Sequence, residues 1–159
     1  MINILASIEG AEPVVIEAMF PTTARRLFAA WTEPDQVRQW FGLDPTMLTD
    51  VRIDLREGGH WRFVMRAGRD REEYLEGQYL EILPEERLTF SWSHHVKTAE
   101  GQHDQTPPSQ VSIRFEPHGK ATRMTLEHKA ISTEGGRLGV RKGWIASFES
   151  LAEAVAAKF

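Results

Sequence analysis

The stretch ATRMTLEHKAISTEGGRLGVRKGWIASFESLAEAV (residues 121–155) contains both layers of the expected fold. Residues 122–129 alternate between two faces, as in a half-buried strand, and His128 is the polar member of an otherwise inward row. The pair Gly135-Gly136 is expected to precede a closing helix, in which apolar residues recur at spacings of four, three and four. This buried stripe consists of Trp144, Phe148, Leu151 and Val155. The stretch therefore predicts a last strand followed by a long helix that covers the sheet.

Upstream of this stretch, the two-residue period extends back for about eighty residues and begins near Met47. It predicts strands at Val51–Leu55, His60–Arg66, Tyr74–Leu83, Leu88–Ser93 and Val111–Phe115. Glycine and proline turns separate several of these strands, which is typical of antiparallel hairpins. An earlier strand at Val14–Phe20 ends at Pro21, which cannot donate a ladder hydrogen bond.

Two short helices are expected after this first strand. Thr22 and Thr23 can cap a helix over Ala24–Trp31, and Pro34 can open a second one that Gly42 closes. Between the later strands, residues Thr98–Pro108 contain few apolar groups and are expected to form an exposed loop.

The order of these elements predicts an α+β fold with an antiparallel sheet of about seven strands. Only the C-terminal helix is long and apolar enough to cover one face, so the sheet must curl around it. A helix about 10–12 Å wide cannot fill the concavity of a strongly twisted sheet. The remaining volume is either packed with large side chains or left as a cavity for a ligand.

Composition narrows the possible partners. A chain of 159 residues is expected to form a single domain over residues 1–159. Its 19 basic and 23 acidic residues give a formal charge of −4 and no basic stripe, so we expect no nucleic-acid partner. There is no cysteine for a thiolate metal site, and no apolar run approaches the ~20 residues that a membrane span needs. We expect a cytoplasmic protein with no cofactor and no membrane insertion.

The chain resembles the SRPBCC or START-like superfamily, and within it bacterial proteins similar to the C-terminal domain of the activator of the 90-kDa heat-shock chaperone's ATPase. The resemblance covers about 130 residues, and six weak signals occur in the family's order. They are Ala29–Pro34 with Arg38–Gly42, Arg56–Phe63, Gly77–Ile82, Pro84–Leu88, Thr125–His128, and Gly143-Trp144 with the helix that follows.

This resemblance implies a helix-grip (Bet v-like) fold with an internal cavity, but no single activity. Members of the superfamily include lipid and hormone binders, aromatic polyketide cyclases and proteins that sequester reactive natural products. The chaperone activators carry a further N-terminal domain, for which we expect no room in this chain.

Ten residues are candidates for lining the cavity, because large rings can converge between the sheet and the helix. They are Trp40, Phe41, Trp61, Phe63, Tyr79, Phe90, Trp92, His128, Trp144 and Phe148. The alternative for each ring is that it packs the core.

The acid–base candidates are His60 and His128, the two histidines expected to face the cavity or its edge. A catalytic role needs a polar partner, and Glu76, Gln78 and Tyr79 are the nearest by strand order. A histidine satisfied by a neighbouring polar group is the alternative, and we assign no catalytic residue.

A metal site is not expected either. His94 and His95 are adjacent in a strand, so they point to opposite faces and cannot both bind one ion.

Three hypotheses about function follow. The first is a non-enzymatic protein that binds a small hydrophobic molecule, such as a lipid or an aromatic, polyketide-like compound. The second is a polyketide cyclase or dehydratase that uses His128 or His60. The third is an interaction protein with the 90-kDa heat-shock chaperone as its partner. A monomer and a homodimer are both compatible with the sequence.

Overall fold

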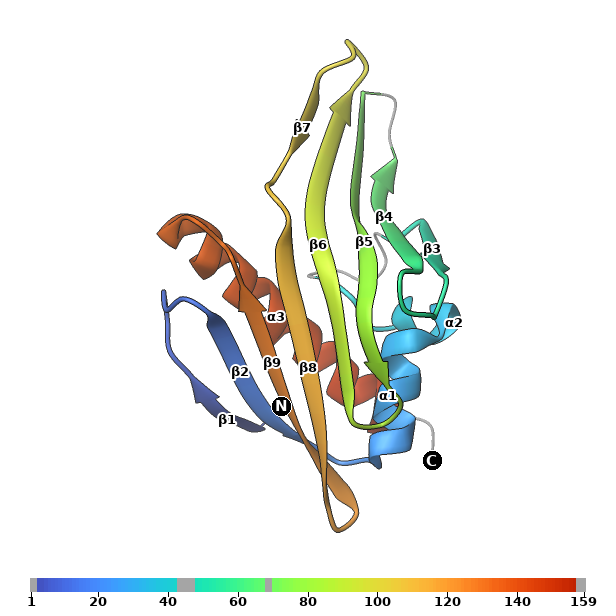
Figure 1. Ribbon diagram of the computed structural model, residues 1–159, viewed down its shortest axis with the longest axis vertical. Helices are drawn as coiled ribbons and strands as arrows, with labels where there is room; N and C mark the ends of the chain where they lie inside the picture. The colour runs from blue at the N-terminus through green and yellow to red at the C-terminus, as the bar shows by residue number, and fades with distance from the viewer. Residues whose placement is uncertain (1–2, 43–47, 68–69, 157–159) are drawn as a thin grey trace.

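The computed structural model describes residues 3–42, 48–67 and 70–156. Figure 1 shows one antiparallel sheet with the long C-terminal helix lying behind it. The strand order is β1-β2-β9-β8-β6-β5-β4-β3, and β7 pairs with β6. The strands are β1 (Asn3–Ser7), β2 (Val14–Phe20), β3 (Asp50–Ile53), β4 (His60–Ala67), β5 (Arg71–Leu83), β6 (Arg87–Thr98), β7 (His103–Gln105), β8 (Ser109–His118) and β9 (Ala121–Lys129). The helices are α1 (Ala24–Thr32), α2 (Pro34–Val37) and α3 (Glu134–Ala156).

This architecture confirms the α+β class and the helix-grip fold. Within the described residues the sheet has nine strands, not about seven, because two of these strands lack a clear sequence signal. The register between β1 and β2 shifts between Ile4 and Ala6, so β1 shows no clean alternation. The three residues of β7 are polar and exposed, and they lie inside the segment Thr98–Pro108 that was predicted to be a loop. That segment is exposed as expected, but it contains a short strand that pairs with the end of β6.

Two helix boundaries also differ from the prediction. The pair Gly135-Gly136 lies inside α3, because Thr133 caps the helix and its Oγ1 accepts a hydrogen bond of 3.0 Å from the Gly136 amide. The second short helix ends at Val37, and the chain continues through a hydrogen-bonded turn. The predicted start of the sheet at Met47 lies outside the described residues.

The core lies between the inner face of the sheet and α3, with α1 closing one end. The predicted stripe of Trp144, Phe148, Leu151 and Val155 is buried, which confirms that this face of α3 packs against the sheet. The rings of Phe148 and Phe20 meet edge to face at 5.6 Å. Burial of this stripe and of the facing strand residues is the main source of stability.

Gly77 in β5 allows the indole of Trp61 to pass close to the backbone of β5. A Cβ at this position would lie 1.9 Å from the Ser91 carbonyl oxygen and 2.8 Å from the indole Nε1 of Trp61. That indole nitrogen donates a 3.2 Å hydrogen bond to the same carbonyl. Only glycine leaves room for the indole to reach across β5 to β6.

Substituting Gly77→Ala is therefore expected to lower the free energy of unfolding by about 1–3 kcal/mol, because backbone and indole must both move. Urea denaturation followed by circular dichroism measures the change. The matched control is Gly139→Ala in α3, where a Cβ meets nothing within 4 Å and alanine favours the helix. Equal stability of the Gly77→Ala variant and the native protein would contradict the expected clash.

Candidate functional site

A cavity of about 920 Å³ lies between α3 and the sheet. Its volume falls within the range typical of small-molecule sites. Strands β4, β5 and β6, the beginning of β8, the end of β9 and the first half of α3 contribute to its wall. Most of the wall is apolar and comes from Phe41, Leu48, Met65, Leu75, Trp92, Ile131, Val140 and Trp144. The exposed residues Thr106, Pro107 and Thr133 mark its mouth.

Glycines explain why the cavity lies beside only the first half of α3. Gly135, Gly139 and Gly143 are four residues apart and line the cavity, as does Gly136. A Cβ at any of the first three would meet nothing within 4 Å, so each glycine faces open space. Glycine is a poor helix former, so these glycines weaken the first half of α3. The second half of the helix, from Phe148 onward, is tightly packed and stabilises it. The four-residue spacing of these glycines is the sequence signal from which the position of the cavity could have been predicted.

His128 is held in the cavity wall by two hydrogen bonds. The indole Nε1 of Trp144 donates to His128 Nδ1 at 3.1 Å, and His128 Nε2 lies 2.7 Å from Ser109 Oγ. An indole N–H can only donate, so Nδ1 must be unprotonated and Nε2 must carry the hydrogen that Ser109 accepts. Burial lowers the pKa of His128 to about 4, which also keeps the ring neutral.

This geometry matters for the acid–base hypothesis. Because Trp144 and Ser109 occupy both ring nitrogens of His128, neither nitrogen is free to take a proton from a bound molecule. The ring therefore acts as a connector between an indole and a hydroxyl.

His94 and Glu73 form a second polar pair in the cavity wall, which was not predicted from the sequence. His94 Nε2 lies 2.6 Å from Glu73 Oε2, and their side chains are 33% and 24% exposed. Strand register explains the pair, because Glu73 and His94 fall on the inner face of neighbouring strands β5 and β6. Register between two long strands with bulges could not be fixed from the sequence.

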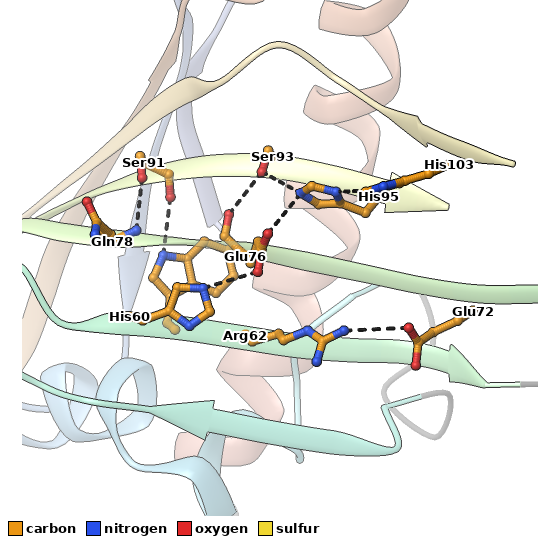
Figure 2. A network of polar contacts seen from close by, with 10 residues as sticks. His60, Arg62, Glu72, Glu76, Gln78, Ser91, Ser93, His95 and His103 are labelled. Carbon is orange, nitrogen blue, oxygen red and sulfur yellow. Dashed lines mark hydrogen bonds and ion pairs between the residues drawn. The ribbon is translucent and has the colours of Figure 1, made fainter. Parts of the chain in front are cut away.

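The other histidines of this part of the sheet lie on its outer face (Figure 2). His60 Nε2 is 3.1 Å from Glu76 Oε1, and His95 Nε2 is 3.2 Å from Glu76 Oε2. His95 Nδ1 is in turn 2.9 Å from His103 Nε2. The prediction that His94 and His95 point to opposite faces is thus confirmed.

The expectation that His60 faces the cavity or its edge is wrong. Trp61 takes the inner position on β4, so the two-residue period turns His60 outward, where its side chain is 54% exposed. Glu76 and Gln78 are its neighbours, as strand order suggested, but none of the three residues lines the cavity.

The ten predicted cavity residues fall into two groups. Phe41, Trp92, His128 and Trp144 line the cavity. The other six are buried in the core away from its wall: Trp40, Trp61, Phe63, Tyr79, Phe90 and Phe148. Their rings contact one another, as Trp61 and Phe90 do at 5.4 Å, and burial raises the pKa of the Tyr79 hydroxyl. Large rings therefore fill the core beside the second half of α3, and the glycines of its first half leave the cavity unfilled.

Within the described ranges, no group of three or more histidine, aspartate or glutamate side chains could hold a metal ion. In the same part of the chain, no helix has the length and apolar character needed to cross a membrane.

Comparison with known proteins gives a family and a set of similar folds. Residues 21–156 match the model of the family described as Activator of Hsp90 ATPase homolog 1-like protein. Among curated proteins, no sequence matches the chain.

Solved structures include close matches to the whole fold. A protein from Nitrosomonas europaea is 22% identical, with 95% of this chain and 98% of that chain covered and a TM-score of 0.74. The AHSA1 protein from Silicibacter pomeroyi is 23% identical, with coverages of 92% and 99% and the same TM-score of 0.74. DynU16, a protein in the dynemicin biosynthetic locus, is 22% identical over 90% of this chain and 46% of its own, with a TM-score of 0.67. These structural similarities establish the fold, but sequence identities this low leave the activity open.

Proposed function

The chain belongs to the Activator of Hsp90 ATPase homolog 1-like family, and we propose that it binds a small apolar molecule in the cavity between the sheet and α3. The observation that carries this proposal is the open, glycine-lined space beside the first half of α3. Without a ligand, this hollow of about 920 Å³ leaves its mainly apolar wall in contact with water, and a bound apolar molecule would cover that surface.

The composition of the wall supports an apolar ligand. Aromatic and aliphatic side chains from both layers surround the space, and burial of a ligand against them contributes about 25 cal/mol per Å² before ordering costs. The similar fold of a protein from a biosynthetic locus is in keeping with a small organic ligand.

The cyclase hypothesis receives less support, because His60 lies outside the cavity and both ring nitrogens of His128 are engaged. The chaperone-partner hypothesis draws on the name of the family and on no described feature of the surface.

A cavity-filling variant tests the proposal. Gly143 lines the cavity, and a Cβ at this position would meet no heavy atom within 4 Å. Gly143→Phe is therefore expected to occupy the space without breaking the fold. We expect its affinity for Nile red, an uncharged apolar dye, to fall at least about tenfold, a loss of about 1.4 kcal/mol. Fluorescence titration of the native protein and the variant measures this change.

The matched control is Glu149→Phe, which adds the same ring to an exposed position of α3. It should bind Nile red as the native protein does. Equal binding by the Gly143→Phe variant would contradict the proposal. Separately, native mass spectrometry of freshly purified native protein would identify the ligand class if a small molecule co-purifies.

A further inference from the structure

The cavity wall contains a chain of hydrogen bonds that ends in a serine hydroxyl. The indole of Trp144 donates to His128, and His128 donates to Ser109. All three residues are buried, and all three line the cavity. The indole N–H of Trp144 determines which nitrogen of His128 carries the hydrogen, and that hydrogen is donated to Ser109. Ser109 Oγ therefore has one lone pair occupied and its own hydrogen left to donate.

That hydrogen is only weakly held by the protein. Its acceptor is the carbonyl oxygen of Trp92, at 3.3 Å from Ser109 Oγ. Hydrogen bonds from hydroxyl groups to oxygen are usually about 2.7–2.8 Å long. Rotation about the Cβ–Oγ bond can therefore redirect the hydrogen to an oxygen atom in the cavity at little cost.

The charges around the cavity disfavour an anionic ligand. None of the described residues that line it is lysine or arginine, and the carboxylate of Glu73 belongs to the wall. The imidazole of His94 is already engaged, because its Nε2 lies 2.6 Å from Glu73 Oε2. A carboxylate or phosphate placed there would lose its hydration without gaining a cation.

We propose that the ligand is an uncharged apolar molecule with a carbonyl oxygen, and that this oxygen accepts a hydrogen bond from Ser109. This inference rests on the proposed function, because it names the chemical class that the cavity selects. Ketones, esters and quinones belong to this class, and fatty acids and phospholipids do not. The apolar part of the ligand would lie along the glycine face of α3.

Three naphthalenes of similar size test both parts of the inference. They are 2-acetylnaphthalene, with a ketone, 2-ethylnaphthalene, with a methylene in its place, and 2-naphthoate, with a carboxylate. Displacement of Nile red at pH 8 gives a Kd for each. We expect 2-acetylnaphthalene to bind the native protein at least about tenfold more tightly than 2-naphthoate.

The hydrogen bond is isolated by a double-mutant cycle with Ser109→Ala. The ratio of the Kd of 2-ethylnaphthalene to that of 2-acetylnaphthalene is expected to fall about fivefold in this variant. Ser109→Thr, which keeps a hydroxyl, should restore the ratio. The control Ser112→Ala removes a serine from the outer face of the same strand, where its partner is Thr89, and should leave the ratio unchanged.

A readout on the native protein covers the case in which Ser109→Ala does not fold. The carbonyl stretching band of bound, carbon-13-labelled 2-acetylnaphthalene should lie at a lower wavenumber than in hexane. A band at the hexane position, an unchanged ratio in Ser109→Ala, or 2-naphthoate binding as tightly as the ketone would each overturn the inference. Those results leave Nile red binding intact, whereas failure of Nile red and of every naphthalene to bind would overturn the proposed function as well.

Discussion

Substituting Trp144→Ala is expected to lower the free energy of unfolding by about 3–5 kcal/mol. The indole is only 3% exposed, and its ring lies 5.2 Å from that of Trp92 and 5.7 Å from that of Trp31. Alanine would remove these contacts and also the donor to His128 Nδ1, which would be left buried without a partner. Denaturation by urea at neutral pH measures the loss.

The variant Trp144→Phe separates packing from hydrogen bonding. It retains a large ring but not the N–H, so its cost should be about 1–3 kcal/mol, mainly from the unpaired nitrogen of His128. A loss below about 1 kcal/mol in Trp144→Ala would mean that the ring is not part of the packed core. Nile red binding should also change in Trp144→Ala, because the same ring forms part of the cavity wall.

Periodicity was sufficient to predict most of the fold. The alternation along residues 122–129 matches the register of β9 with both β2 and β8, in which Leu126 lies opposite Ile16 and Ile113. The signal was strong because one face of this strand is buried along its whole length. β7 shows the opposite case: its three residues are exposed and polar, so only pairing with β6 makes them a strand.

The cavity was harder to predict than the fold. The rule that aromatic rings converge between the layers is correct for Trp92 and Trp144, yet it also selected Trp61 and Phe90, which pack against each other. Ring size alone does not distinguish a residue that lines the cavity from one that packs the core, because both environments are apolar. What decides the position of the cavity is the absence of side chains at Gly139 and Gly143.

The polar pairs in the cavity wall could not be predicted from the sequence for a different reason. The pairing of His94 with Glu73 depends on the register of β5 against β6, which shifts between Tyr79 and Glu81. A shift of one residue exchanges the faces of a strand, so such a pair could not be derived without the structure. His128 was identified as the polar member of an inward row, but its two partners come from β8 and α3, far apart in the sequence.

His128 is expected to make the protein less stable as the pH falls from 7 to 4. Burial lowers its pKa to about 4 in the folded protein, whereas an unfolded chain has a histidine pKa of about 6.5. Between these values the unfolded state binds more protons than the folded state, so the free energy of unfolding rises with pH and is lost on acidification. The two pKa values correspond to a loss of about 3 kcal/mol over this range.

The variant His128→Gln assigns this loss to one residue. A glutamine amide can still accept from the indole of Trp144 and donate to Ser109, but it does not titrate. Burial also lowers the pKa of His95, so this histidine too makes the protein less stable at low pH. Because His95 is present in both the native protein and the variant, its effect cancels in the comparison. The difference between native protein and variant, measured by urea denaturation at pH 7, 5.5 and 4.5, therefore reports on His128 alone. Parallel curves of stability against pH would show that His128 is not held neutral in the fold, and the hydrogen-bond chain that leaves Ser109 free to donate would lose its basis.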